Sequence, residues 1–357
     1  MELESVELLP LHVELNEPFG IATGVHQAVD NVLIVLRLQG GVVGRGEAAP
    51  VPHISGETQA EVLALQSELG RALTGLDLAA YRKVSAVLGE VIGHLPSARA
   101  GVEMALLDAL TRKAQISLWK FFGGAVGTLH TDITVPTGDV QHAARSATRA
   151  AALGFTELKV KIGGASPDLD IERLVRIGEA APSARILLDG NTAYSASEAC
   201  RLIASLGTLR TRIALFEQPV PREDLEGLRE VEAKTGIPVA ADESLRSRAD
   251  LAKILRLGGI SAVNIKTAKL GVIEAWDLLV TARTAGLQVM IGGMVETEMS
   301  MTVSACLAAG VGGVRYVDLD TPLFLAESPF SGGFAQSGPL LDLRPIQAGH
   351  GVTLRST

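Results

Sequence analysis

The sequence predicts an α/β barrel preceded by a smaller α+β domain. With 357 residues, the chain is longer than a single hydrophobic core usually serves. Beyond about residue 125, short apolar segments alternate with stretches whose apolar residues recur at helical spacing, as in parallel strands joined by helices. Eight such apolar segments occur, which suits a closed parallel barrel. A doubly wound open sheet is the alternative arrangement of the same elements.

The first part of the chain has a different rhythm. Residues 2–15 and 31–39 alternate in polarity or are rich in Val and Ile, which predicts antiparallel strands. The stretch between them, residues 16–26, contains proline and glycines and predicts a loop. Apolar residues at helical spacing then predict helices within 58–89 and 97–122. This mixture is typical of an α+β domain.

Composition excludes several classes of function. The net charge is −8, the pI is about 5.5, and no run of Lys or Arg forms a basic patch, so we expect neither a nucleic-acid nor a membrane partner. The amino terminus lacks a positively charged segment and no uncharged apolar run is long enough to span a bilayer. Cys200 and Cys306 form neither a disulfide framework nor a zinc-binding spacing. We therefore expect a cytoplasmic protein.

The predicted barrel strands end in ionisable residues in a regular order. The eight strands are expected at 133–136, 157–162, 185–189, 213–217, 238–241, 262–266, 288–292 and 315–319. Five in succession, from the second to the sixth, end in or just before Lys161, Asp189, Glu217, Asp242 and Lys266, at intervals of 28, 28, 25 and 24 residues. Because the carboxyl ends of barrel strands meet on one rim, we expect these side chains to converge.

This set of side chains indicates a particular chemistry. Three carboxylates on one rim repel one another, and a hard divalent cation such as Mg²⁺ relieves that repulsion. Lys159 and Lys161 are two residues apart on a strand, so both point the same way. We expect like charge and burial to lower a lysine pKa here and make a neutral amine base accessible. None of the seven histidines lies between residues 159 and 320, which leaves lysines and carboxylates as the acid/base candidates.

Several motifs resemble the enolase superfamily in its muconate-lactonizing-enzyme subgroup, and the resemblance covers nearly the whole chain. They are GEAAP at 46–50, the helix and Gly-Gly stop at 103–124, LKVKIG at 158–163, DGN at 189–191, FEQP at 216–219, ADES at 241–244 and NIKTAKLG at 264–271. The resemblance implies a modified TIM barrel, (β/α)₇β, at 126–325. It also implies an N-terminal α+β capping domain at 1–125 and a C-terminal segment, 326–357, that returns to the capping domain.

The resemblance also implies roles for the residues at the strand ends. It implies that Asp189, Glu217 and Asp242 ligate Mg²⁺. It places Lys161 and Lys266 on opposite faces of the substrate, with Lys159 assisting, and it places Asn191, Glu243 and Asn264 beside the ligands. Such sites use a lysine or histidine base with Mg²⁺ to stabilise an ene-diolate formed from a carboxylate substrate. Two lysines permit 1,1-proton transfer, although relatives with both lysines also catalyse lactonisation or dehydration.

Asp318 and Asp320, at the end of the eighth strand, favour one reaction among these. Alternate residues of a strand share a face, so both carboxylates can point at the substrate, where they call for a cation. The pair resembles the dipeptide epimerases, such as L-Ala-D/L-Glu epimerase, in which it holds the free α-ammonium group. We therefore expect epimerisation of the second residue of a dipeptide. An o-succinylbenzoate synthase, an N-acylamino acid racemase and a muconate cycloisomerase remain the alternatives.

The capping domain is expected to set the preference for the second side chain. The segment resembles Ala-Glu epimerases at Phe19, but Gly24 stands where those enzymes carry an arginine, and no Lys or Arg precedes Arg37. We expect a neutral or apolar second residue. Further candidates for substrate contact are Ile21, Thr23, Thr137 and Glu296. By the same resemblance a homo-oligomer is expected.

Overall fold

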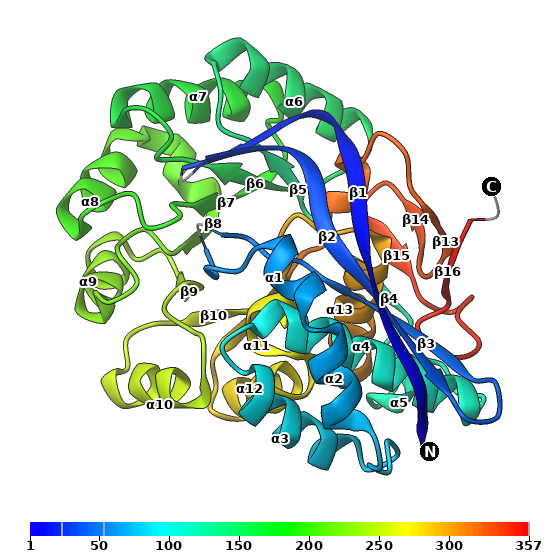
Figure 1. Ribbon diagram of the computed structural model, residues 1–357. Coiled ribbons are helices and arrows are strands. Elements are labelled where there is room, and N and C mark those ends of the chain that lie inside the picture. The colour runs from blue at the N-terminus through cyan, green and yellow to red at the C-terminus, as the bar shows by residue number, and fades with distance from the viewer. Residues whose placement is uncertain (23, 53, 356–357) are drawn as a thin grey trace.

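The computed structural model describes residues 1–22, 24–52 and 54–355 and consists of a parallel barrel with an antiparallel domain packed over one end (Figure 1). The eight barrel strands are β5 (Ile133–Val135), β6 (Glu157–Lys161), β7 (Arg185–Asp189), β8 (Ile213–Glu217), β9 (Val239–Ala241), β10 (Ala262–Ile265), β11 (Gln288–Gly292) and β12 (Tyr316–Asp318). Each differs from its predicted range by at most one residue at either end, so the strand predictions are confirmed.

The strand order excludes the doubly wound alternative. Neighbouring strands in the sheet are consecutive in the chain from β5 to β12, all seven pairs are parallel, and no switch point occurs. The amide of Asp132 donates to the carbonyl of Val317 at 2.9 Å, which brings the first and last strands together. The barrel is therefore nearly closed, and seven strand–helix units precede an eighth strand, as in a (β/α)₇β barrel.

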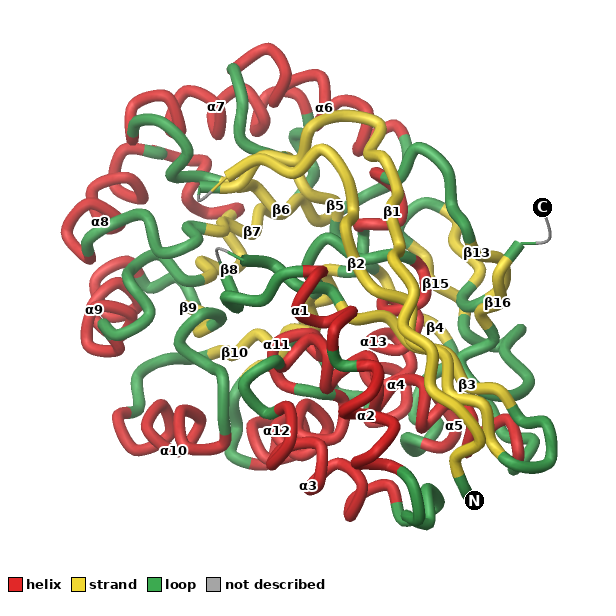
Figure 2. Tube along the Cα trace, in the orientation of Figure 1, coloured by secondary structure: helices red, strands yellow, loops and turns green. Residues whose placement is uncertain are grey.

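Helices surround the barrel on its outside (Figure 2). They are α6 (Val140–Ala152), α7 (Pro167–Ala180), α8 (Ala196–Ser205), α9 (Leu225–Thr235), α10 (Arg248–Leu257), α11 (Thr267–Leu270), α12 (Val272–Thr284) and α13 (Glu298–Val311), with 3₁₀ turns η1 (Gly207–Arg212) and η2 (Thr321–Phe324). Most begin after a Ser, Asp or Thr whose side chain accepts a backbone N–H of the first turn, as at Asp139, Ser166 and Ser195. The main core lies between these helices and the strands.

Over its described residues, the N-terminal domain consists of a three-stranded antiparallel sheet and five helices. The strands are β1 (Leu3–Ile21), β2 (Gly24–Leu38) and β3 (Val43–Ala48), and the helices are α1 (Gln59–Ala64), α2 (Gln66–Leu73), α3 (Tyr81–Ile92), α4 (Pro96–Lys113) and α5 (Leu118–Phe121). The glycine of the GEAAP motif is needed for close packing. A Cβ atom on Gly46 would lie 2.1 Å from the carbonyl oxygen of Gly101, so only glycine lets β3 approach α4 this closely.

One prediction about this domain is wrong. The expected loop at 16–26 belongs largely to a hairpin, because β1 continues to Ile21 and β2 begins at Gly24. Pro18 is tolerated because β1 is an edge strand whose register shifts between Glu14 and Phe19, where the ladder is interrupted. The helices predicted within 58–89 are α1, α2 and α3, of which α3 continues to Ile92, and a break follows Leu73, where Gly75 adopts a φ of +79°.

Beyond η2 the chain forms short strands that contact both other parts of the molecule. They are β13 (Phe330–Gly332), β14 (Ala335–Ser337), β15 (Leu340–Asp342) and β16 (Val352–Leu354), and β15 also pairs with β4 (Thr128–His130). The amide of Ala326 donates to Glu14 at 2.8 Å, and Arg112 donates to the carbonyl of Val352 at 3.1 Å. Among the helices of the described residues, none combines the length and apolar character needed to span a bilayer.

Candidate active site

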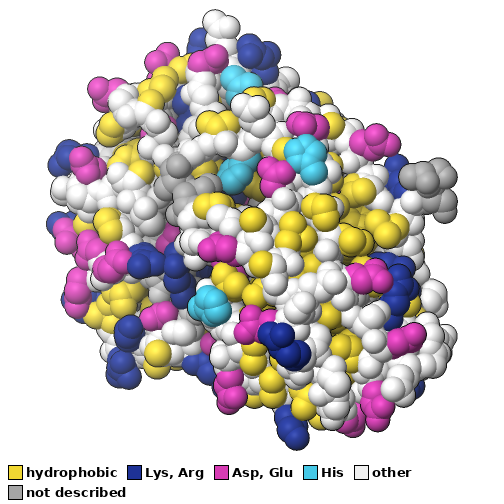
Figure 3. Space-filling view, viewed as in Figure 1, with side chains coloured by type: hydrophobic (Ala, Val, Ile, Leu, Met, Phe, Trp, Pro, Cys, Tyr) yellow, Lys and Arg dark blue, Asp and Glu magenta, His cyan; other side chains and the backbone are white. Residues whose placement is uncertain are grey.

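A cavity lies between the hairpin of β1 and β2 and the carboxyl ends of the barrel strands. The N-terminal domain contributes Phe19, Ile21, His26, Val51 and Ile54, and the barrel contributes Thr134, Lys161, Asn191, Asp242, Glu243, Arg246, Lys266, Lys269, Asp318 and Asp320. Hydrophobic side chains gather over the hairpin on the same face of the molecule (Figure 3). The cavity is thus apolar on the side of the N-terminal domain and strongly charged on the barrel side.

The barrel side of the cavity holds interleaved buried carboxylates and lysines. Lys159 Nζ lies 3.1 Å from Asp189 and 2.8 Å from Glu217. Lys161 Nζ lies 2.6 Å from Asp189, and Lys266 Nζ lies 2.7 Å from Asp242. The strand ends therefore converge as the spacing predicts, because parallel strands in register deliver their last residues to one rim.

The three carboxylates at the ends of β7, β8 and β9 differ in pKa because their electrostatic surroundings differ. Burial opposes ionisation of Asp189, but the attraction of Lys161 and Lys159 outweighs it and lowers the pKa below its ordinary value. For Asp242, the attraction of Lys266 likewise outweighs burial, and its pKa falls well below the usual range. Glu217 differs, because burial and the repulsion of Asp189 raise its pKa to about 8. Adjacent lysines therefore favour the ionised forms of Asp189 and Asp242, whereas Glu217 is the carboxylate whose ionisation they compensate least.

The expected lowering of a lysine pKa is wrong for two of the lysines. Burial does oppose the charged form of Lys159, yet the attraction of Asp318, Glu217 and Asp189 outweighs it and raises the pKa well above the ordinary value. The pKa of Lys266 is raised for the same reason, with Asp242 as the largest attraction. Spacing along the chain reveals a neighbouring lysine but not the carboxylates of the adjacent strands, whose attraction dominates.

The residues present fit a hard divalent cation. Asp189, Glu217 and Asp242 offer oxygen atoms from three successive strands, and all three residues are at most 3% exposed. Glu217 Oε2 makes no hydrogen bond, although Lys159 lies within ion-pairing distance. Its other oxygen accepts from Asn264 Nδ2 at 2.7 Å, which fixes the direction of the carboxylate. The donor set is the one that Mg²⁺ prefers.

Neighbouring polar side chains hold this set in place. Gln218 Oε1 accepts the amides of Asp242 and Ser244 at 2.9 and 3.2 Å, which fixes the turn after β9. Asn191 donates to Glu243 at 3.2 Å, and burial together with the repulsion of Asp242 raises the Glu243 pKa to about 7. Asn191, Glu243 and Asn264 therefore lie beside the carboxylates, where the sequence interpretation places them.

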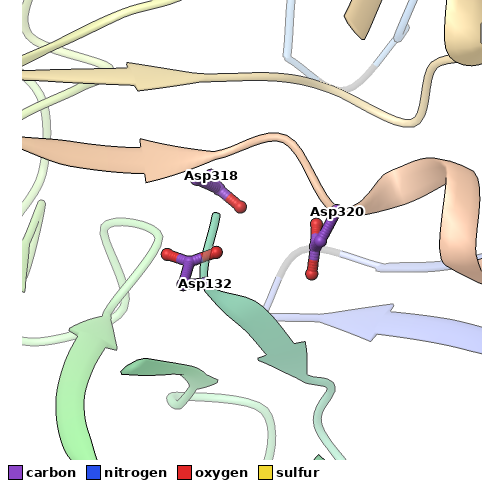
Figure 4. Close-up of side chains that lie close together, drawn as sticks. All are labelled: Asp132, Asp318 and Asp320. Carbon is purple, nitrogen blue, oxygen red and sulfur yellow. The ribbon is translucent and has the colours of Figure 1, made fainter. Parts of the chain in front are cut away.

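A second group of carboxylates lies at the end of β12. Asp318 Oδ2 lies 2.5 Å from Lys159 Nζ, and Asp320 Oδ2 accepts the amide of Thr134 at 2.5 Å. Asp132 joins them, so that one carboxylate oxygen from each of the three lies within 4.8 Å of the others (Figure 4). Burial and the repulsion of Asp318 raise the pKa of Asp320 to about 7. This end of the cavity is built to receive positive charge.

The remaining predicted contacts divide into three kinds. Phe19 and Ile21 line the cavity, whereas Thr23 lies outside the described residues. Thr137 does not line the cavity; it lies under the hairpin, where its amide donates to the carbonyl of Gly20 at 3.0 Å. Glu296 is fully buried behind the cavity wall, where burial and the repulsion of Glu47 raise its pKa to about 8.

Sequence reasoning missed several residues of the site. Lys269 is buried and forms an ion pair with Asp242, whose carbonyl it also contacts at 2.6 Å. Its signal was the Lys-x-x-Lys spacing from Lys266, which puts both on one side of a helical turn. Arg173, on α7, donates to the carbonyl of Lys161 at 2.9 Å and so fixes the end of β6. Asp132 gave no signal, because it precedes its strand rather than ending it.

Comparison with known proteins gives matches over the whole chain. Two family models match: "Mandelate racemase / muconate lactonizing enzyme, N-terminal domain" over residues 5–123 and "Enolase C-terminal domain-like" over residues 142–357. An aromatic dipeptide epimerase of Herpetosiphon aurantiacus is 45% identical, with 99% of both chains covered. An L-Ala-D/L-amino acid epimerase of Populus trichocarpa is 39% identical, with 98% of this chain and 84% of the relative covered.

Solved structures agree with these matches. A dipeptide epimerase from Enterococcus faecalis V583, complexed with Mg and the dipeptide L-Leu-L-Tyr, superposes with a TM-score of 0.94. It is 33% identical to this chain, and the match covers 99% of this chain and 100% of that one. The whole fold, including the domain over the barrel mouth, is therefore shared.

Proposed function

Because the chain belongs to the mandelate racemase/muconate lactonizing enzyme family of the enolase superfamily, we propose that it is a Mg²⁺-dependent dipeptide epimerase. Its substrate would be a dipeptide with a free amino terminus, and the reaction would invert the α-carbon of the second residue. The relatives' activities support this reaction class. One observation carries the proposal: two lysines flank a row of buried carboxylates in a cavity that ends in a second acidic group.

The positions of Lys161 and Lys266 suit proton transfer at two faces of one carbon. Lys161 ends β6 and Lys266 follows β10, and the three strands between them, β7 to β9, carry the carboxylates. Both lysines line the cavity. The α-carbon of a substrate held between them can lose its proton to one neutral amine, and the planar carbanion that results can gain a proton from the ammonium group of the other lysine. The configuration at that carbon is then inverted, and the protonation states of the two lysines are exchanged.

Asp189, Glu217 and Asp242 would hold the Mg²⁺ ion. When bound, the ion supplies Lewis-acid stabilisation of the negative charge that develops on the substrate carboxylate. The chain itself orients this set: Asn264 holds Glu217 at 2.7 Å, and Lys269 holds Asp242. Lys159, paired with Asp189 and Glu217, would assist by holding these two carboxylates in place.

Asp318 and Asp320 distinguish a dipeptide from other carboxylate substrates of the family. Both are at most 7% exposed, and both line the cavity. A buried acidic pair needs a cation, and the α-ammonium group of a dipeptide supplies one. Muconate, o-succinylbenzoate and N-acylamino acids carry no ammonium group, which argues against the cycloisomerase, synthase and N-acylamino acid racemase alternatives.

The apolar wall of the cavity supports a neutral or apolar second residue. Phe19, Ile21, Val51 and Ile54 face the cavity from the N-terminal domain. Arg246 also lines it, but it donates to the carbonyls of Ile54 at 2.9 Å and Glu243 at 3.3 Å. We expect kcat/KM for L-Ala-L-Phe to exceed that for L-Ala-L-Glu by about tenfold or more, since an unpaired carboxylate is costly to bury. A higher value for L-Ala-L-Glu would contradict this preference.

Mass spectrometry of a pooled L,L-dipeptide library tests the proposed reaction. The enzyme is incubated with the library and Mg²⁺ in D₂O, and inversion introduces one deuterium at the α-carbon of the second residue. We expect a one-mass-unit gain in some dipeptides, which EDTA or Lys161→Ala abolishes. If no dipeptide gains mass while o-succinylbenzoate synthase or muconate cycloisomerase activity is found, the epimerase proposal is wrong.

A further inference from the structure

The acidic group at the end of β12 contains one carboxylate more than a two-aspartate site requires. Asp132, just before β5, is 0% exposed, and neither of its carboxylate oxygens has a hydrogen-bond partner among the described residues. Buried polar groups in proteins almost always have partners, and leaving one without any is costly. The carboxylate of Asp132 therefore calls for a partner that the described residues do not supply.

The charges around Asp132 indicate that the missing partner is a cation. Asp318 on β12, Asp320 at the start of η2 and Glu157 on β6 all repel its ionised form, and Lys159 on β6 attracts it. Burial and this repulsion raise the pKa of Asp132 well above its ordinary value. Lys159 is already shared among Asp318, Glu217 and Asp189, at 2.5, 2.8 and 3.1 Å. The ammonium group of Lys159 is therefore not enough to balance Asp132, Asp320 and Glu157 as well.

We propose that Asp132 completes a three-carboxylate site, with Asp318 and Asp320, that selects substrates with a free amino terminus. Asp318 and Asp320 line the cavity, and Asp132 lies behind them, with one oxygen within 4.8 Å of an oxygen on each (Figure 4). An ammonium group that enters from the cavity meets the first two directly, and its positive charge favours the ionised form of the third. This inference rests on the proposed function and adds a specificity residue to it.

A divalent metal ion fits this group less well than an ammonium group does. One oxygen of Asp318 is held by Lys159 and one oxygen of Asp320 by the amide of Thr134. Lys159 Nζ lies 2.5 Å from Asp318, so a divalent ion at this group would meet twice the repulsion from that ammonium charge that a singly charged ammonium group meets. An ammonium group, by contrast, has three donors and no strict geometry.

Calorimetric binding to the Mg²⁺-loaded protein tests the inference. The ligands are L-Ala-L-Phe and N-acetyl-L-Ala-L-Phe, which differ in the charge of the amino terminus. Asp132→Asn keeps the shape of the side chain and removes its charge. Asp139→Asn is the matched control, because it makes the same change at an exposed position on the loop after β5. Asp132→Ser is the second variant if circular dichroism shows that Asp132→Asn does not fold.

We expect Asp132→Asn to raise the Kd of L-Ala-L-Phe about tenfold or more, as losing a buried charge partner does. The Kd of the acetylated peptide, the Kd of Mg²⁺ and all values for Asp139→Asn should stay within about twofold, which corresponds to under half a kcal/mol. An equal loss for both peptides, or no loss for either, would overturn the inference. Weakened Mg²⁺ binding would assign the group to a metal and overturn it as well.

The same samples separate this inference from the proposed function. Deuterium exchange into L-Ala-L-Phe reports the reaction, whereas the Kd values report the ammonium site. Charge-dependent binding that needs Asp132 but leads to no exchange would support the site and contradict the epimerase proposal. Exchange in wild type, with no effect of Asp132→Asn on the Kd, would support the epimerase proposal and contradict the role of Asp132. A wild-type protein that binds neither peptide would contradict both.

Discussion

Replacement of Arg173 by methionine should both destabilise the protein and impair one of the two lysines. Arg173 is 1% exposed, and its guanidinium group donates to the carbonyls of Lys161 and Pro136 at 2.9 and 2.6 Å. It also pairs with buried Asp170 at 3.0 Å. Methionine fills much of the same volume but satisfies none of these three acceptors.

The magnitude follows from the buried ion pair. Removing one partner of such a pair typically costs about 3–5 kcal/mol, because the other charge stays buried. Asp170 keeps contacts with the amide of Gly163 at 2.8 Å and with Tyr194 Oη at 2.6 Å, which moderates the loss. We therefore expect the free energy of unfolding in urea to fall by about 3 kcal/mol.

Arg176→Met is the matched control for this measurement. Arg176 lies on the same helix, but its side chain is 58% exposed and its ion pair among the described residues is with Glu179, at 2.9 Å. A surface pair of this kind contributes about 0–1 kcal/mol. A loss of less than about 1 kcal/mol in Arg173→Met, or equal losses in both variants, would refute the reasoning from the buried pair.

Activity provides a second test, because Arg173 holds the carbonyl of Lys161 and has no contact with Lys266 among the described hydrogen bonds. A displacement of about 1 Å can cost about 100-fold in rate. Deuterium exchange should therefore fall more for one epimer of the dipeptide than for the other in Arg173→Met. A merely structural role would lower exchange of both epimers equally.

Three further predictions concern the charged groups of the site. Glu217→Gln or chelation of Mg²⁺ should reduce α-proton exchange by about a thousandfold or more, since Lewis-acid stabilisation supplies several kcal/mol; mass spectrometry in D₂O measures it, and retained exchange would contradict the metal assignment. Asp318→Asn and Asp320→Asn should raise KM for a dipeptide about tenfold or more, whereas exposed Glu327→Gln should not; unchanged KM values would exclude an ammonium site. Burial, with the repulsion of Glu47, raises the pKa of Glu296 from 4.5 to about 8. The protonated side chain therefore contributes its full stability to the fold below pH 4.5, and this contribution is lost as the pH rises through about 8. The free energy of unfolding in urea of Glu296→Gln, relative to wild type, should increase by several kcal/mol between pH 5 and pH 8, and a constant difference would show that the pKa is ordinary.

The barrel could be predicted because its determinants are local. Each strand is a short apolar segment between amphipathic helices, and its last residue defines the rim. The convergence of Asp189, Glu217 and Asp242 followed from counting residues between strand ends. The hairpin formed by β1 and β2 could not be predicted in the same way, because the register shift that tolerates Pro18 depends on pairing between distant residues.

The rest of the site depends on three-dimensional relations that spacing does not reveal. Asp132 reaches Asp318 because the first and last strands are staggered where the barrel closes, so a residue before β5 lies beside the end of β12. The raised pKa of Lys266 depends on which charges are nearest, and this cannot be read from the order of residues. Arg173 was hidden for another reason: an arginine on a helix usually faces solvent, and this one faces the barrel.

The central claim, proton transfer by Lys161 and Lys266 at opposite faces, is tested most directly by ¹H NMR of the α-proton in D₂O with each lysine replaced by alanine. We predict that Lys266→Ala exchanges the α-proton of one epimer of L-Ala-Phe without inverting it. Lys161→Ala should exchange only the other epimer. Continued epimerisation by either variant, or exchange of the same epimer by both, would contradict the two-lysine mechanism.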